Sequence, residues 1–179
     1  DDDTNDPDTD TDTDSDTDSD TDTDTDTEDP DWPTGDPTTT FTGDLSDGAI
    51  IDLDWADQST VACWVATENM NFDGNHVFHE TTQGEDRDLW VRVTPDSGVD
   101  VSLYGMQFGS SIQTPPDVTS CIACEAGFDW VDDSNPGRKE EIFMSGWSPY
   151  KVLIGVAGAN GTTSGGYTVE VWDVENPWS

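Results

Sequence analysis

The sequence is very poor in basic residues. Lys and Arg together number 5 among 179 residues, against 41 Asp and Glu, and the formal net charge at pH 7 is −36. Nucleic acids and anionic membrane surfaces attract clustered Lys and Arg, so this composition argues against both as partners. It favours divalent cations, basic partners, or solubility in a salty medium that screens charge repulsion.

Long apolar runs are also missing. None approaches the ~18 residues that a membrane-spanning helix requires, so we expect no membrane insertion by this chain. The first residues, DDDT, look like the start of a mature product whose export signal has been removed. We therefore expect an exported bacterial or archaeal protein that is extracellular or held at the cell surface.

The first part of the chain lacks bases and nearly all aromatic residues. Residues 1–37 carry 18 Asp or Glu, no Lys or Arg, and one aromatic residue, Trp32. Residues 4–28 run close to a repeat of Thr or Ser followed by Asp, which predicts a solvated, self-repelling stalk. Its hydroxyls are candidate O-glycan sites, and its carboxylates are candidate weak Ca²⁺ ligands. We expect 1–37 to be this stalk with a Pro-containing linker, and 38–179 to be the folded domain.

Convincing amphipathic helices are absent from the sequence, and period-2 runs rich in β-branched and aromatic residues take their place. The clearest are Tyr150–Val156 and Tyr167–Val171, which a Gly-rich link joins and which we expect to form an antiparallel hairpin. The sequence predicts an all-β sandwich, with 106–139 either functional or containing a strand of unclear pattern. Further strands are expected at 49–55, 61–66, 76–80, 89–94, 99–105 and 141–144.

Three motifs follow one another in the second half of the chain. Gly98–Tyr104 reads G-x-D-x-x-L-Y, and Tyr150–Val156 and Gly165–Val171 follow the patterns Y-x-V-x-V and G-x-Y-x-L-x-V loosely. Their order resembles that of the bacterial pre-peptidase C-terminal (PPC) domain. The likeness covers roughly residues 45 to 174. It implies a jelly-roll-like antiparallel β-sandwich of about eight strands, used as a non-catalytic accessory module on secreted enzymes and surface proteins.

Acidic loops make Ca²⁺ the metal that the sequence favours. Ca²⁺ binds several carboxylate and carbonyl oxygens, and the loops 73–75, 85–88 and 129–135 offer such donors beside turn residues. The resemblance adds Asp100, because some PPC domains bind Ca²⁺ through acidic loops. The alternative is ordinary turn chemistry, in which Asp and Asn bond their own backbone. The candidate ligands are Asp73, Asn75, Asp86, Asp88, Asp100, Asp129, Asp132 and Asp133.

The three cysteines favour a disulfide over a metal site. Cys63, Cys121 and Cys124 allow three pairings, of which we favour Cys121–Cys124 because it would pin the long irregular stretch. Zinc needs four ligands, and His76 and His79 lie three apart on a strand, which points them to opposite faces. One thiol is left over, either exposed or buried as a small apolar group.

No motif points to catalysis. The sequence has no G-x-S-x-G turn, and the segment 163–166, TSGG, has neither an Asp nor an evident base beside its serine. Carboxylates are so abundant that no acid–base pair stands out. We therefore expect a protein that is not an enzyme.

Eight tryptophans are many for a chain of this size. Trp90 and Trp172 fall on the strand parity opposite the aliphatic residues, and Trp147 and Trp178 lie outside clear strands. Such residues can bind glycan rings or a neighbouring subunit, unless loops or the tail cover them. We expect an extracellular structural or adhesive surface protein, a homo-oligomer or filament that calcium stabilises. The alternatives are a stalk-tethered glycan- or matrix-binding module and an accessory domain of a secreted hydrolase.

Overall fold

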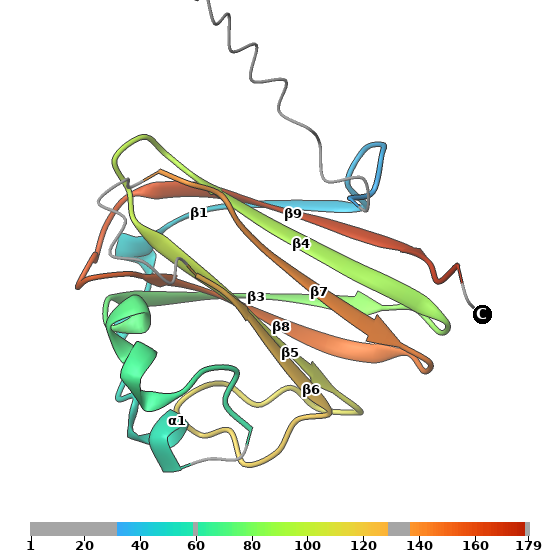
Figure 1. Ribbon diagram of the computed structural model, residues 1–179, viewed down its shortest axis with the longest axis horizontal. Helices are drawn as coiled ribbons and strands as arrows, with labels where there is room; N and C mark the ends of the chain where they lie inside the picture. The colour runs from blue at the N-terminus through green and yellow to red at the C-terminus, as the bar shows by residue number, and fades with distance from the viewer. Residues whose placement is uncertain (1–31, 59–60, 129–136, 178–179) are drawn as a thin grey trace, which may run out of the picture. The chain divides into compact units, whose positions relative to one another are not determined.

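The computed structural model describes residues 32–58, 61–128 and 137–177, so nearly all of the expected stalk lies outside the described residues (Figure 1). Two antiparallel sheets pack face to face in this part of the chain, which confirms the all-β sandwich. One sheet has the order β1 (Thr39–Asp44), β9 (Gly166–Glu175), β4 (Arg87–Pro95) and β7 (Glu140–Gly146). The other has the order β2 (Ala49–Ile50), β3 (Asn75–Gln83), β8 (Tyr150–Gly158), β5 (Val101–Phe108) and β6 (Ala123–Gly127).

Alternating aliphatic residues fill the space between the sheets, as the period-2 pattern predicts. The strands expected at 76–80, 89–94, 99–105 and 141–144 are all present, with boundaries shifted by a few residues. The core between the sheets comprises Leu45, Leu89, Val91, Val93, Val101, Leu103, Ile142, Met144, Val152, Ile154, Val156, Tyr167, Val169 and Val171.

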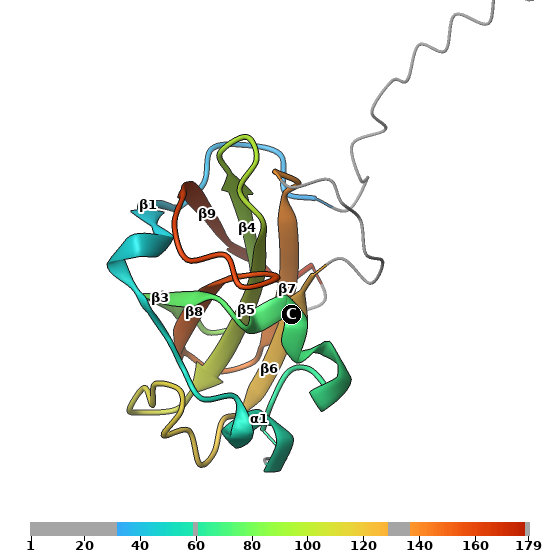
Figure 2. The ribbon, with the colours of Figure 1, turned by 90° about the vertical axis from the view of Figure 1, so that its left-hand side faces the viewer.

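The expected hairpin of β8 and β9 is wrong in its pairing, although both strands exist. β8 pairs with β3 and β5, whereas β9 pairs with β1 and β4 in the other sheet. The Gly-rich link therefore crosses from one sheet to the other, which Figure 2 shows in orange-red. Both strands bury their β-branched faces in the same core from opposite sheets. The alternating pattern is therefore the same as in a hairpin, although the two strands are not paired.

The five-stranded sheet is buried on both faces. All eight residues of β5 are buried, which a strand with one solvated face does not show. The outer face of this sheet is covered by the connection from β2 to β3, which contains α1 (Asp54–Gln58) and the 3₁₀ helix η2 (Ala66–Phe72) (Figure 1). A second cover is the stretch before β6, whose Ile112 and Val118 pack near Met106 and Phe108.

This covering connection is where two expected strands are wrong. The range 49–55 shrinks to the two residues of β2, because the Asp52 carboxylate accepts the N–H of Asp54 at 2.9 Å and starts α1 there. The range 61–66 forms no strand among its described residues and runs into η2. The apolar residues of both ranges pack on the sheet as a third layer. Alternating spacing alone does not distinguish a strand of the sheet from a segment that covers it.

One strand was not expected, because β1 begins at Thr39, next to the expected Pro-containing linker. β6 lies inside the irregular stretch 106–139 and confirms the alternative that this stretch contains a strand. A short 3₁₀ turn, η1 (Leu45–Asp47), follows β1. Within the described residues, no helix has the length and apolar character needed to cross a bilayer.

Candidate interaction surface

The outer face of the four-stranded sheet carries a row of aromatic side chains. Phe143 of β7 lies opposite Trp90 of β4, and Trp90 lies opposite Trp172 of β9. The Trp90 and Phe143 ring centroids are 4.5 Å apart. We call Phe143, Trp90 and Trp172 the aromatic row. Such a row on one sheet face is a large apolar contact area with fixed geometry.

A charged row lies beside it, one pleat further along each strand. Arg92 of β4 lies opposite both Glu141 of β7 and Glu170 of β9. Its Nε donates to Glu141 Oε1 at 2.6 Å, and Lys139 Nζ lies 3.2 Å from the same oxygen. The surface therefore presents guanidinium donors and carboxylate acceptors next to aromatic rings.

Trp32 covers one end of the aromatic row. Its ring meets Trp90 and Trp172 edge-on, with centroids 5.1 and 5.4 Å away, and the Arg92 guanidinium carbon lies 4.2 Å from its ring centroid. Trp172 also donates its Nε1–H to Gly35 O at 3.0 Å. The segment that enters the domain thus packs on this face and stabilises it by aromatic and cation–π contacts.

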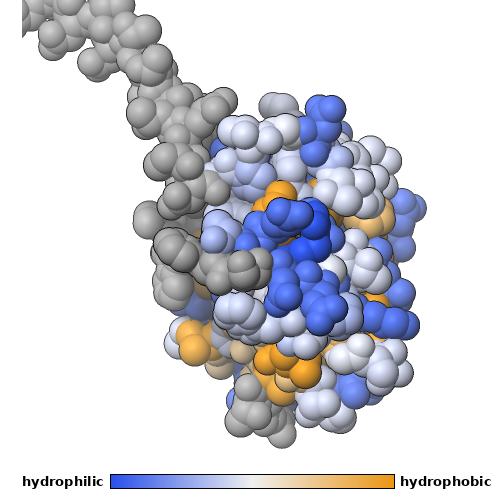
Figure 3. Space-filling model, turned by 90° about the vertical axis from the view of Figure 1, so that its right-hand side faces the viewer, coloured by the Kyte–Doolittle hydropathy of each residue, from blue (hydrophilic) through white to orange (hydrophobic). Residues whose placement is uncertain are grey.

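The covering decides which aromatic residues a partner can reach. Trp172 is only 6 % exposed, whereas Phe143, at the far end of the row, is 41 % exposed. Trp147 lies in the turn between β7 and β8 and is 63 % exposed. That end of the molecule, at the right of Figure 1, shows separate apolar patches around a hydrophilic centre (Figure 3). Trp178, the fourth predicted interaction residue, lies outside the described residues.

The predicted metal ligands Asp73, Asn75 and Asp100 meet around the link between β8 and β9. Asp73 Oδ1 accepts the N–H of Gly161 at 2.6 Å, and Asp100 Oδ2 accepts from the Asn160 amide at 3.0 Å. The Asn75 amide donates to the carbonyls of Leu45 and Thr163. These side chains hold the crossing link through hydrogen bonds to residues far away in the sequence, and not through local bonds to their own turns.

The other predicted ligands lie elsewhere. Asp86 lies in the β3–β4 turn and Asp88 at the start of β4, where Asn176 donates its backbone N–H to Asp86 O and its amide to Asp88 Oδ1. Asp129, Asp132 and Asp133 lie outside the described residues. In the ranges that the structure covers, no group of three or more His, Cys, Asp or Glu side chains is arranged to hold a metal ion. Calcium therefore stays a prediction.

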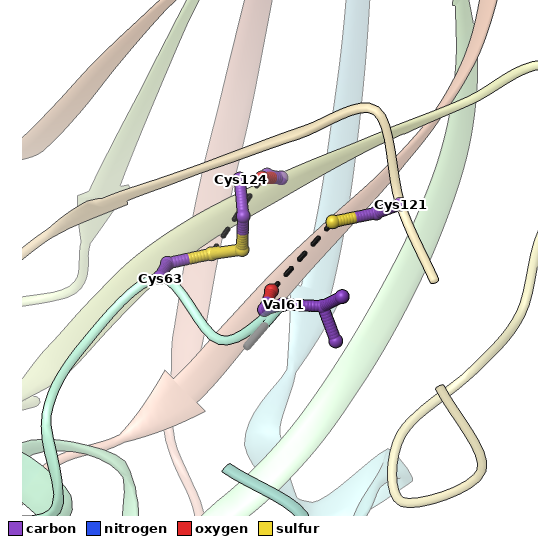
Figure 4. Close-up of a disulfide and its surroundings, with 5 residues drawn as sticks. Val61, Cys63, Cys121 and Cys124 are labelled. Atoms are coloured by element: carbon purple, nitrogen blue, oxygen red, sulfur yellow. Dashed lines mark hydrogen bonds between the residues drawn. A yellow bond between two sulfur atoms is a disulfide. The ribbon is translucent and has the colours of Figure 1, made fainter. Parts of the chain in front are cut away.

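The disulfide joins Cys63 to Cys124, so the favoured Cys121–Cys124 pairing is wrong (Figure 4). The Cα atoms of the pair are 4.9 Å apart, and the bond fastens the covering connection to edge strand β6. Cys121 keeps its thiol, which points to Val61 O at 3.6 Å. Partial burial raises the pKa of this thiol.

Both histidines are used inside the fold. His76 points to the outer face of its sheet, with Nε2 2.7 Å from Phe72 O. His79 points to the core between the sheets, where it stacks on Phe41 and lies 3.0 Å from the Tyr167 hydroxyl. The expectation of opposite faces is confirmed. Desolvation lowers the pKa of both imidazoles.

Sequence reasoning missed three residues of this surface. The composition of residues 1–37 places Trp32 in the linker, the pattern of 141–144 gives Phe143 only an ordinary strand position, and no motif marks Arg92. The distribution of the five bases is nevertheless a signal in the sequence for this surface. All except Lys151 belong to β4 or to residues 138–139 just before β7.

No family model matches the chain, and no curated protein matches it. Among solved structures, the chain is similar to CorA, described as a surface-associated copper-binding protein important in copper acquisition by Methylomicrobium album BG8. The TM-score is 0.41 and the sequence identity is 10 %, over 75 % of this chain and 93 % of that chain. A likeness of this size leaves the function to be argued from the residues themselves.

Proposed function

We propose that this chain is a non-enzymatic, extracellular adhesive protein that binds carbohydrate through the exposed end of the aromatic row. The observation that carries the proposal is the placement of Phe143 and Trp90 beside Arg92 and Glu141. A pyranose presents C–H groups on its faces and hydroxyls around its rim. Aromatic rings pack against the C–H faces, and charged donors and acceptors form hydrogen bonds with the hydroxyls.

Two further features support an extracellular, non-enzymatic role. The Cys63–Cys124 disulfide persists in oxidising compartments and is rare in the cytosol. His76 and His79 both contact tyrosine hydroxyls inside the fold and are removed from the surface just described. The PPC resemblance, which is a separate proposal, agrees with a module that binds and does not catalyse.

Carbohydrate binding is tested with a glycan array, followed by titration of any ligand found. Phe143→Ala should weaken binding at least tenfold, because the exposed ring is the part of the row that a sugar can reach. Ile122→Ala is the matched control, since Ile122 is 60 % exposed on the stretch leading to β6. Equal binding by both variants, or no ligand for the wild-type chain, would remove carbohydrate from the proposal.

Calcium is a separate part of the proposal and has its own test. A ligand that binds only the folded state raises the melting temperature. Calorimetry in millimolar Ca²⁺ and in chelator measures this directly. An unchanged melting temperature would remove calcium, and an increase that Asp73→Asn abolishes would place the ion at the β8–β9 link.

A further inference from the structure

The two open edges of the sandwich differ from each other. On one side, the edge strands β6 and β7 lie against each other. They approach so closely that a Cβ atom on Gly127 would collide with the backbone oxygen of Glu141. On the other side, the facing edges belong to β1 and β3. This second side is hollowed, with a volume of about 380 Å³. The lining residues are Thr39, Phe41, Glu80, Thr81, Thr82, Ile112 and Lys151.

The hollow exposes the free edge of β3. β8 pairs with β3 from His76 to Gln83, but β2 pairs only with Asn75 and His76 on the other side. Along residues 77–83, no strand of the described chain occupies that side. The backbone groups there form a template for one more strand. β3 contains neither Lys nor Pro, which commonly protect such edges.

The two walls of the hollow have different chemistry. A strand added to β3 would point alternate side chains to its two faces. On the inner face it would meet Phe41, Thr39 and Thr81, which carry no charge. On the outer face it would meet Ile112, Glu80, Thr82 and Lys151. Lys151 is the base that stands apart from the four-stranded sheet.

We propose that this hollow receives the Thr/Ser-Asp tail of a second copy of the chain as an added β-strand. Residues 9–28 alternate strictly, with Thr or Ser at every odd position and an acid at every even one. In an extended strand all hydroxyl side chains then face one way and all carboxylates the other. Thr is β-branched and pairs well with Thr across strands, so the hydroxyl face suits Phe41, Thr39 and Thr81. The acidic face turns outward toward Lys151 and solvent, and it passes Glu80, whose repulsion salt screens.

The length and repeat of the tail also fit this role. The 20 residues of the repeat exceed the seven of the free edge, and an extended tail of this length spans roughly 65 Å. The repeat has the same period as a strand, so a shift by two residues gives the same contacts. A tail inserted into the next copy is a head-to-tail contact, which propagates into chains of subunits.

Charge sets the condition for this contact. Tail and domain are both strongly acidic, so their mutual repulsion opposes insertion, while the backbone hydrogen bonds that drive it do not depend on ionic strength. At about 1 M salt the screening length falls to about 3 Å. Association should therefore strengthen as salt rises, which is opposite to binding between surfaces of unlike charge.

The experiment measures the mass of the full-length chain by light scattering in about 1 M NaCl, with variants of each half of the contact. Thr39→Trp fills the inner wall of the hollow, and Thr42→Trp, on the exposed outward face of the same strand, is its control. In a tail variant, Pro replaces every Thr and Ser from residue 9 to 27, which removes the N–H groups and keeps all acids. Its control has Ser at these positions.

The wild-type chain and both controls should exceed the 19.5 kDa monomer mass in a concentration-dependent way. Thr39→Trp and the Pro variant should each stay monomeric, and an equimolar mixture of the two should give one complex of about twice that mass. A monomeric wild-type chain, association by Thr39→Trp, or a mixture that stays monomeric would overturn the proposal. None of these outcomes depends on Phe143, so carbohydrate binding stands or fails separately.

Discussion

The imidazole Nδ1 of His76 lies 2.9 Å from the hydroxyl of Tyr104, beneath the layer that covers the five-stranded sheet. The other ring nitrogen, Nε2, lies 2.7 Å from the Phe72 carbonyl oxygen, which can only accept a hydrogen bond. Nε2 must therefore carry the proton. In the neutral ring Nδ1 then accepts from Tyr104, so both nitrogens are satisfied without charge.

Protonation of His76 should destabilise the protein. Burial lowers the pKa of this imidazole below its ordinary value of 6.5, so the unfolded chain takes up the proton first as pH falls. The contribution of neutral His76 is present in full above about pH 6.5 and is lost as pH falls toward the folded-state pKa, by at most about 1.4 kcal/mol per pH unit. Urea unfolding of wild type and His76→Gln between pH 8 and 5 should show a shallower decline in the variant. Identical slopes would contradict this prediction, with His79 unchanged in both proteins.

The sequence predicts correctly those strands in which apolar residues alternate with outward-facing ones and only one face of the sheet packs on the core. Leu89, Val91 and Val93 alternate with polar or bulky outward residues, and the structure buries all three completely. In the β2–β3 connection the same spacing does not predict a strand, because Trp64 and Phe72 belong to a third layer that packs on the outer face of the five-stranded sheet. The pairing of β8 was not predictable either, because a Gly-rich link fits a hairpin and a crossing between sheets equally well.

The candidate surface depends on register, which the sequence did not contain. Parity placed Trp90 and Trp172 on the outward side of their strands, and this is where they lie. That they face each other, with Phe143 as the third member, follows from the pairing of β4 with both β9 and β7. The burial of Trp172 follows from Trp32, more than a hundred residues away in the chain.

Removal of the disulfide should lower the free energy of unfolding more than removal of the free thiol. The bond closes a loop with a sequence separation of 61 residues, for which chain entropy gives about 4 kcal/mol, and native disulfides typically contribute about 2–5 kcal/mol. The double variant Cys63→Ala/Cys124→Ala should lose this amount in urea unfolding. Cys121→Ala keeps the bond and should lose less than about 1.5 kcal/mol. Equal losses, or a Cys121–Cys124 crosslink in peptide mapping, would show that the pairing differs.

Gly155 is required by the ring of Tyr104. Gly155 lies on β8 directly opposite Tyr104 on β5, and a Cβ atom there would collide with the aromatic carbons. Because Tyr104 is fully buried, its ring cannot move into solvent, and Gly155→Ala should cost about 1–3 kcal/mol. Gly109→Ala is the matched control, since a Cβ atom at Gly109 would meet nothing within 4 Å. Urea unfolding and near-UV circular dichroism of both variants test this, and equal stability would contradict it.

Trp32 should stabilise the domain although it lies before β1, the first strand. Its ring contacts Trp90, Trp172 and the Arg92 guanidinium, and each aromatic pair contributes about 0.5–1.5 kcal/mol beyond the area it buries. Trp32→Ala should therefore lower the free energy of unfolding by about 2–4 kcal/mol, the sum of two such pairs and part of the buried ring. Trp147→Ala, at a largely exposed tryptophan, is the control and should stay within about 0.5 kcal/mol of wild type. If Trp32→Ala were as stable as the control, the entry segment would not be part of the folded unit, and Trp172 would be open to partners together with Phe143.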